Sequence, residues 1–145
     1  MPIEILNRQR KRRVNSKRWR ELAERALKAI SESRSREATI VLVSDAAIRK
    51  LNHQFRGKNY ATDVLSFPVQ HERFEKRREK NLGEVVISLD RAAVQAKENG
   101  LTFTNEVEQL ILHGLLHLCG YDHETDAGEM NRLELKLRKK LGIYT

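Results

Sequence analysis

The sequence predicts an α+β protein, with a small, mostly parallel mixed sheet of about four strands packed with helices. Up to Gly100, short stretches rich in Val, Ile and Leu alternate with segments of helical periodicity. Beyond Gly100 every predicted element is a helix. One of these helices is apolar almost all the way round, so we expect it at the centre of the core.

The length and composition predict a single domain covering residues 1–145. The chain has 145 residues, 39% of them hydrophobic, which is enough for an ordinary core. It has only two prolines and seven glycines, and no repeat or low-complexity segment marks a linker. A second domain therefore has no obvious place to begin.

In the first part of the chain we expect two strands, each followed by a helix. Residues 3–7, IEILN, predict a short strand. Ser16 can cap a helix that runs to about Ser33, with an apolar side that includes Trp19. The uninterrupted stretch 38–44, ATIVLVS, is typical of a central strand. Asp45 then caps a second helix, which carries Ile48, Leu51 and Phe55.

The middle of the chain predicts two further strands and a helix. Residues 56–63 form a loop, and 64–69, VLSFPV, form a strand. Pro68 suggests that this strand lies at an edge of the sheet or ends there, because proline has no N–H to donate to a neighbouring strand. The segment 82–90 is another strand, and the helix after it closes at Gly100.

Two helices complete the prediction. Thr104 starts the apolar helix that ends near Cys119. Asp126 and Glu129 have the spacing of a capping box for a last helix, which ends near Gly142.

The charge balance favours a polyanionic partner. The formal net charge is +8 and the isoelectric point is near 9.9, which favours nucleic acid first and an anionic membrane surface second. No apolar run approaches the length of a membrane span, and the N-terminus lacks the apolar centre of a secretory signal. The single cysteine, Cys119, fits a reducing compartment. We therefore expect a cytoplasmic protein with no membrane association.

A polar stripe interrupts the apolar helix of residues 104–119. It consists of Glu106, Gln109, His113 and His117. The two histidines are one turn apart on the same face, so both imidazoles can point at one ion. An HxxxH pair alone is a modest signal, because helices also pack such pairs as hydrogen-bonded core residues.

A third histidine strengthens the prediction of a metal site. Gly120 lies where a helix needs a left-handed residue to stop, and His123 follows six residues after His117. Three imidazoles suit Zn²⁺ and leave a fourth position open, as in catalytic sites. No second cysteine is available to complete a structural site, and Cys119 points off the histidine stripe. We expect one catalytic Zn²⁺ per chain, held by His113, His117 and His123.

The histidine spacing matches that of metzincin proteases, but one residue argues against a peptidase. Those enzymes place a glutamate directly after the first histidine, where it acts as general base. Here that position is Gly114. The peptidase mechanism therefore lacks its proton acceptor.

The segment 113–123, HGLLHLCGYDH, resembles the HGxLHLxGYDH motif of the YbeY proteins, bacterial metal-dependent endoribonucleases of ribosomal RNA maturation. The segments 56–68, RGKNYATDVLSFP, and 82–88, LGEVVIS, support the resemblance and follow in the family's order. The sequence departs from the family pattern at Ala61, where proline is usual, and at Glu84, where aspartate is usual. Neither residue is a predicted ligand.

The resemblance implies a function and a set of site residues. Zinc would be held by His113, His117 and His123, with Arg56 beside the metal cleft, and all four would be catalytic. A guanidinium can hold a phosphate through two hydrogen bonds and stabilise developing charge. The activity implied is a single-strand-preferring, zinc-dependent endoribonuclease of ribosomal RNA processing, at the 3′ end of small-subunit RNA, and of ribosome quality control. The partners implied are ribosomal RNA and the ribosome or its proteins, not DNA.

Several residues keep two interpretations. The segment 8–20 carries eight basic side chains around Trp19, and it either follows an RNA backbone or forms a solvated helix face. We favour a core position for Trp19. We take His53 and His71, which stand alone, as surface residues. Asp122 and Glu124 flank the third histidine and either orient a ligand or serve as turn carboxylates.

Two other functions fit parts of the sequence. A non-catalytic RNA- or ribosome-binding assembly factor with a structural metal would explain the charge equally well. A hydrolase acting on a non-nucleic substrate is disfavoured by Gly114 and by the basic balance.

Overall fold

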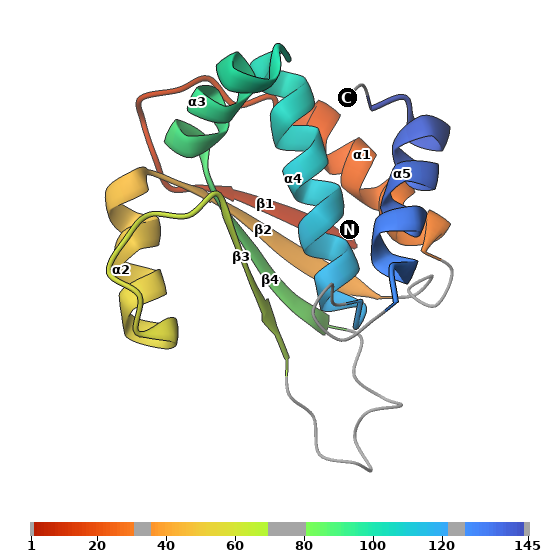
Figure 1. The fold of residues 1–145 in the computed structure, drawn as a ribbon, viewed down its shortest axis with the longest axis horizontal. Coiled ribbons are helices and arrows are strands. Elements are labelled where there is room, and N and C mark those ends of the chain that lie inside the picture. Colours follow the sequence, from red (N-terminus) through yellow and green to blue (C-terminus); the bar gives the residue numbers. More distant parts are fainter. Residues whose placement is uncertain (1, 31–35, 70–80, 122–126, 144–145) are drawn as a thin grey trace.

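The computed structural model describes residues 2–30, 36–69, 81–121 and 127–143 of the chain. Within these ranges strands and helices alternate and then give way to helices, as the sequence predicts (Figure 1). The elements are β1 (Ile3–Asn7), α1 (Ser16–Ala29), β2 (Glu37–Val43), α2 (Asp45–Arg56), β3 (Val64–Pro68), β4 (Asn81–Ser88), α3 (Leu89–Asn99), α4 (Phe103–Leu118) and α5 (Glu129–Leu141).

The strands form one mixed, mostly parallel sheet in the order β1-β2-β4-β3. The pairs β1–β2 and β2–β4 are parallel, whereas β3 runs antiparallel to β4 at the edge. Pro68 is the last residue of that edge strand, so both expectations for this proline are confirmed. The predicted fold class is confirmed as well.

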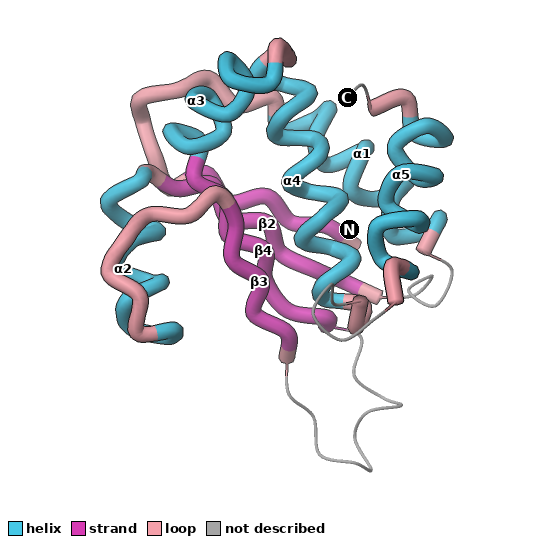
Figure 2. The backbone as a smooth tube through the Cα atoms, in the orientation of Figure 1, coloured by secondary structure: helices cyan, strands magenta, loops and turns pink. Residues whose placement is uncertain are grey.

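Helices cover the two faces of the sheet unequally. α1, α4 and α5 lie on one face, with α3 packed on α4, and α2 lies on the other (Figures 1 and 2). Because neighbouring strand residues point to opposite faces, Val85 and Ile87 join the core under α4, whereas Val86 joins the smaller core under α2. α4 is buried along most of its length and touches β3, β4 and three other helices. It is the central helix that the sequence predicts.

The starts of three helices differ from those predicted. Each observed cap has a side-chain oxygen that accepts a hydrogen bond from the backbone N–H three residues further on. The residues expected from the sequence lie inside the first turn, because each helix starts at or before them. The observed caps of α1 and α2 are Asn15 and Ser44, where Ser16 and Asp45 were expected. α4 begins at Phe103 with Thr102 as its cap, whereas Thr104 was expected to start this helix.

Other boundaries differ by a few residues. The strand expected to reach residue 90 ends at Ser88, which caps α3. Arg56 is the last residue of α2 and not part of a loop. Gly100 and Gly142 end α3 and α5 as predicted. Gly128 caps α5, and Asp126, half of the predicted capping box, lies outside the described residues.

The basic N-terminal segment contributes to the core. Trp19 is buried and packs edge-to-face against Phe103, with ring centroids 6.1 Å apart, which confirms its expected core position.

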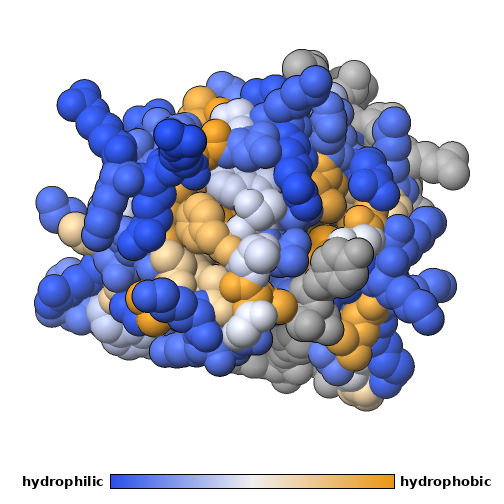
Figure 3. Space-filling model, turned by 90° about the horizontal axis from the view of Figure 1, so that it is seen from above, coloured by the Kyte–Doolittle hydropathy of each residue, from blue (hydrophilic) through white to orange (hydrophobic). Residues whose placement is uncertain are grey.

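Figure 3 shows that hydrophilic side chains cover most of the face seen from above. Among the described residues we find no helix with the length and apolarity that crossing a membrane requires.

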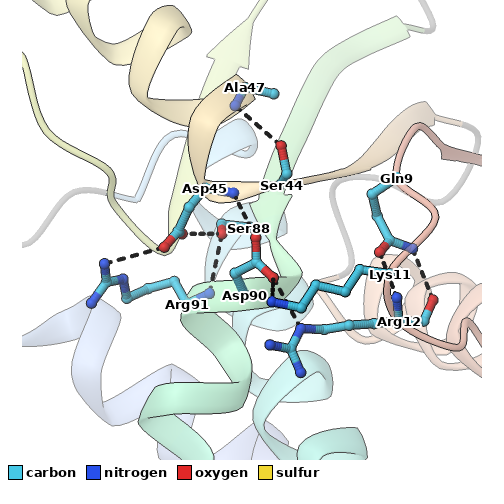
Figure 4. Close-up of polar contacts among 9 residues, drawn as sticks. All are labelled: Gln9, Lys11, Arg12, Ser44, Asp45, Ala47, Ser88, Asp90 and Arg91. Atoms are coloured by element: carbon cyan, nitrogen blue, oxygen red, sulfur yellow. Dashed lines mark hydrogen bonds and ion pairs between the residues drawn. The ribbon is translucent and has the colours of Figure 1, made fainter.

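A polar network joins the carboxyl ends of β1, β2 and β4 (Figure 4). Asp90, in the first turn of α3, accepts the backbone N–H of Asp45 at 3.0 Å and the Arg12 Nε–H at 3.1 Å. Asp45 accepts hydrogen bonds from Ser88 and Arg91 in return. The network therefore ties the starts of α2 and α3 to the segment after β1.

The pKa of Asp90 is lowered from its ordinary value of 3.8. The largest cause is the hydrogen bond from the Asp45 backbone, helped by Arg12 and Lys11 and opposed by burial. A carboxyl whose pKa is depressed by folding stabilises the protein above its unfolded pKa. This stabilisation is lost as the pH falls through the folded value.

We therefore predict a pH-dependent effect of Asp90→Asn. The variant should be less stable than the parent at neutral pH, and the gap should narrow as the pH falls below about 4. Urea unfolding midpoints of both proteins, measured between about pH 3 and pH 7, test this. A gap of constant size at every pH would contradict it.

Candidate functional site

The position of α4 over the sheet depends on Gly114. A Cβ atom on this residue would lie 2.4 Å from Cγ1 of the buried Val85 on β4, far closer than atoms can approach. The carbonyl of Gly114 also accepts a hydrogen bond from the Ser66 hydroxyl on β3, at 3.3 Å. The glycine that stands in place of the peptidase glutamate thus brings the backbone beside His113 against β4.

His113 and His117 form a close pair on α4. Their rings meet edge-to-face with centroids 4.7 Å apart, and the two Nε2 atoms are 3.2 Å apart. The pair lies in the last two turns of the helix, one helical turn apart as the HxxxH spacing predicts.

Glu134 on α5 holds the first of these rings. Nδ1 of His113 donates to Glu134 Oε1 at 2.6 Å, and the Arg138 guanidinium donates to Oε2 at 2.5 Å. The Glu134 side chain is only 7% exposed, so the carboxylate is held firmly by these two partners. Because a carboxylate only accepts, the proton of the neutral His113 ring lies on Nδ1 and the lone pair lies on Nε2.

Glu134 was not among the residues predicted from the sequence, although a signal was present. Met130 and Leu137 place one side of α5 in the core, and Glu134 lies between them on that side, four residues before Arg138. A carboxylate in such a position is found only with partners. One partner is the arginine, and the other is the histidine on the neighbouring helix.

A small cavity opens beside His113, between α4, α5 and the start of β3. Its volume is about 270 Å³. Carboxylate, amide, imidazole and guanidinium groups dominate its lining, which consists of Asp63, Val64, Glu106, Gln109, Leu110, His113, Glu134 and Arg138. Three of the four residues of the polar stripe, Glu106, Gln109 and His113, therefore face this hollow together with Glu134 and Arg138 of α5.

The donor set of the histidine pair fits a zinc ion. Two nitrogen ligands at about 2.0–2.1 Å from a tetrahedral Zn²⁺ are roughly 3.3 Å apart, close to the observed Nε2–Nε2 distance. The same distance fits a hydrogen bond from the His117 ring to the His113 ring. Both arrangements require the Nε2 lone pair of His113, which the contact with Glu134 provides.

The remaining predicted ligand cannot be placed. His123 lies outside the described residues, as do Asp122 and Glu124. Within the ranges that the structure describes, no group of three or more His, Cys, Asp or Glu side chains could hold a metal. Gly120 has the predicted left-handed conformation, with φ 98°, so the chain does turn directly after α4.

Arg56 lies apart from the histidine pair. It is exposed at the end of α2, on the opposite face of the sheet from α4, with β3 between them. Adjacent residues of β3 reach to the two sides, Ser66 to the carbonyl of Gly114 and Phe67 to the ring of Phe55. The residues next to Arg56 and His113 therefore contact neighbouring positions of the edge strand from opposite sides.

Other residues singled out in the sequence lie away from the histidine pair or next to it without a predicted role. Arg12 and Arg18, from the basic segment, pair with Asp90 and Glu108. His53 is exposed on α2, as expected, and His71 lies outside the described residues. Cys119 is half-buried at the end of α4.

The chain is similar over most of its length to proteins that are already named. A family profile described as "Endoribonuclease YbeY" matches residues 4–142. The endoribonuclease YbeY of Geobacter metallireducens is 38% identical over 144 residues, which cover 99% of this chain and 95% of that protein. The endoribonuclease YbeY of Solibacter usitatus is 49% identical over 105 residues, 72% of this chain and 66% of that protein. The solution structure of TM1509 from Thermotoga maritima is similar, with a TM-score of 0.63 and 29% identity over 96% of this chain and 88% of that one.

The close packing at Gly114 generates a test. Gly114→Ala should destabilise the protein by about 1–3 kcal/mol, because the new methyl group overlaps Val85. In a Val85→Ala background the same change should be neutral or stabilising, since alanine favours a helix by about 1 kcal/mol over glycine. Denaturant unfolding of the four proteins measures the coupling. Additive effects of the two substitutions would contradict the packing account.

Proposed function

Because this chain belongs to the endoribonuclease YbeY family, we propose that it is a zinc-dependent endoribonuclease that cleaves single-stranded RNA in ribosomal RNA processing. The observation that carries the proposal is the His113–His117 pair held by Glu134. Such a carboxylate–histidine arrangement is the usual support of an imidazole that binds a metal.

His113, His117 and His123 would hold the zinc ion, one per chain. When bound, Zn²⁺ supplies a Lewis acid that polarises a phosphate oxygen and makes a water molecule acidic at neutral pH. The chain itself supplies the orientation of the ligands. Glu134 keeps the His113 proton on Nδ1, and Arg138 balances the charge of the buried Glu134 carboxylate.

Arg56 belongs to the proposal as the residue that holds an RNA phosphate. Its guanidinium can make two parallel hydrogen bonds to phosphate oxygens. The edge strand β3 separates it from the histidine pair, so an RNA strand reaching both would cross that edge. The exposed position of Arg56 leaves its guanidinium accessible to such a strand.

The substrate proposed is ribosomal RNA, at the 3′ end of the small-subunit RNA, with a further role in ribosome quality control. The ribosome or its proteins would then be partners, and the protein would act in the cytoplasm. The relatives named as endoribonucleases support the RNA substrate, and the net charge of +8 suits a polyanion. The choice of ribosomal RNA rests on the sequence resemblance.

Cleavage of a labelled single-stranded RNA tests the proposal. His117→Ala should abolish cleavage and lower the zinc content. Glu134→Gln should keep the fold and weaken zinc binding about 10- to 100-fold, because the supporting carboxylate is removed. Arg56→Ala should lower kcat/KM about 100-fold or more, and Arg56→Lys should restore little, since lysine cannot make the paired hydrogen bonds.

His71→Ala is a matched control that removes an imidazole outside the predicted set. It should cut RNA like the parent, and elemental analysis of all variants should report the zinc. Cleavage by the His117→Ala protein at the parent's rate would identify a contaminating nuclease. The non-catalytic assembly factor would then be the better account.

A further inference from the structure

A surface on α2 combines exposed aromatic rings with positive charge. Among the described residues, four large hydrophobic side chains are exposed, and the two aromatic ones both lie near the end of α2. Phe55 is 58% exposed and Tyr60 is 54% exposed. An aromatic ring left in water at this level, beside cations, is a feature of surfaces that stack unpaired bases.

A groove runs between the outer side of α2 and the segment that follows it. Two adjoining cavities of about 460 and 310 Å³ share Ala46, Arg49 and Asn59 in their walls. Tyr60 lines the larger one, and Lys50 and His53 line the smaller one. We call this hollow the α2 groove.

The α2 groove has a positive rim. The exposed charged side chains from residue 45 to residue 63 are Arg49, Lys50, Arg56 and Lys58, all of them cations. The two carboxylates in this stretch are half-buried and already engaged. Asp45 accepts hydrogen bonds from Ser88 and Arg91, and Asp63 accepts one from the backbone of Val64.

The segment that carries Tyr60 is held in place by a buried side chain. Asn52 is 2% exposed, and its Nδ2 donates to the carbonyl of Tyr60 at 2.9 Å. The backbone carbonyl of Asn52 accepts the N–H of Lys58 at 3.3 Å, and Arg49 Nε donates to Asn59 Oδ1 at 3.0 Å. The ring therefore projects from a backbone that needs little ordering when a ligand binds.

Phe55 extends the surface toward the histidine pair. It packs edge-to-face on Phe67 of β3, with ring centroids 5.3 Å apart. The neighbouring residue Ser66 donates to the Gly114 carbonyl on α4, beside His113. Through Phe55, Phe67 and Ser66, the end of α2 is thus connected across the edge strand to the part of α4 that carries His113.

We propose that the α2 groove, with Tyr60 in its wall and Phe55 outside its lining at the end of α2 as stacking platforms, binds a single-stranded segment of RNA that flanks the bond to be cut. The inference rests on the proposed function in taking RNA as the ligand. Single-stranded RNA fits better than a duplex, because the faces of its bases are free to stack on the rings. The cations along the rim would form ion pairs with the RNA phosphates. Stacking does not require hydrogen bonds to the edges of the bases, so binding should depend little on sequence.

Binding without cleavage tests the proposal. The probe is a fluorescein-labelled oligouridine of about twelve nucleotides, a length that an extended groove can hold. Its anisotropy is measured with chelator present. Tyr60→Leu and Phe55→Leu remove a ring but keep an apolar side chain, and each should weaken binding about tenfold. Tyr60→Phe keeps the ring and should bind like the parent.

Matched controls separate stacking from general effects. Val94→Ala changes another exposed hydrophobic residue, on α3, and should leave the affinity unchanged. Lys50→Gln with Lys58→Gln should reduce the slope of log K against log salt by about 1.4, or roughly 0.7 for each phosphate that is no longer neutralised. Circular dichroism should report the parent fold for each variant.

The outcomes distinguish this inference from the proposed function. If the parent binds and cuts RNA but both leucine variants bind it equally well, the α2 groove is not an RNA site and the enzyme assignment stands. The same result is expected if the groove serves an acidic protein partner. If the parent neither binds nor cuts RNA, both proposals fail.

Discussion

The contact between Gly114 of α4 and Val85 of β4 is the constraint on which the arrangement of the site depends. Only a residue without a side chain lets the helix backbone come this close to the sheet. The residue before it, His113, is thereby fixed in height and rotation, with its ring turned to α5. A side chain at residue 114 would push the helix away and change the relation of His113 to both Glu134 and the edge strand.

The carboxylates in the interior of the fold have polar partners, and several of these contacts join elements that are distant in the sequence. Glu134 is buried between His113 and Arg138, so α5 is tied to α4 where the imidazoles lie close together. Asp90 and Asp45 tie the starts of α2 and α3 to the segment after β1. The exposed charge of residues 45–63, in contrast, is of one sign. This division assigns the buried pairs to architecture and leaves the exposed cations of α2 for a polyanion.

The fold was largely predictable from the sequence because each element has a local signal. The uninterrupted run 38–44 and the proline at residue 68 indicated a central and an edge strand, and Gly100 and Gly142 marked helix ends. Helix starts were less predictable, because Asn15 and Ser16 are both good caps, and only the backbone conformation decides between them. The His113–His117 pair followed from helical periodicity. Glu134 did not, because its partner lies on another helix and pairings between helices leave no periodic trace.

The separation of Arg56 from the histidines was also beyond the sequence. The motif that carries Arg56 leads directly into β3, but nothing local shows that α2 and α4 lie on opposite faces of the sheet. As a result, the edge strand β3 lies between Arg56 on α2 and the histidine pair on α4, which the family resemblance assigns to one site. This strand is short and ends in proline. A substrate long enough to cross this edge, such as a flexible single strand, can reach both sides.

The zinc site that we propose consists of the imidazoles of residues 113, 117 and 123, which together would hold one ion. Zinc X-ray absorption spectroscopy of the purified protein tests it most directly, because the ligand elements and their distances are read from the metal. A three-histidine site should give one zinc per chain with three imidazole nitrogens at about 2.0–2.1 Å, a further oxygen ligand and no sulfur. A zinc–sulfur distance of about 2.3 Å, which would bring in Cys119, or a protein without zinc would contradict it.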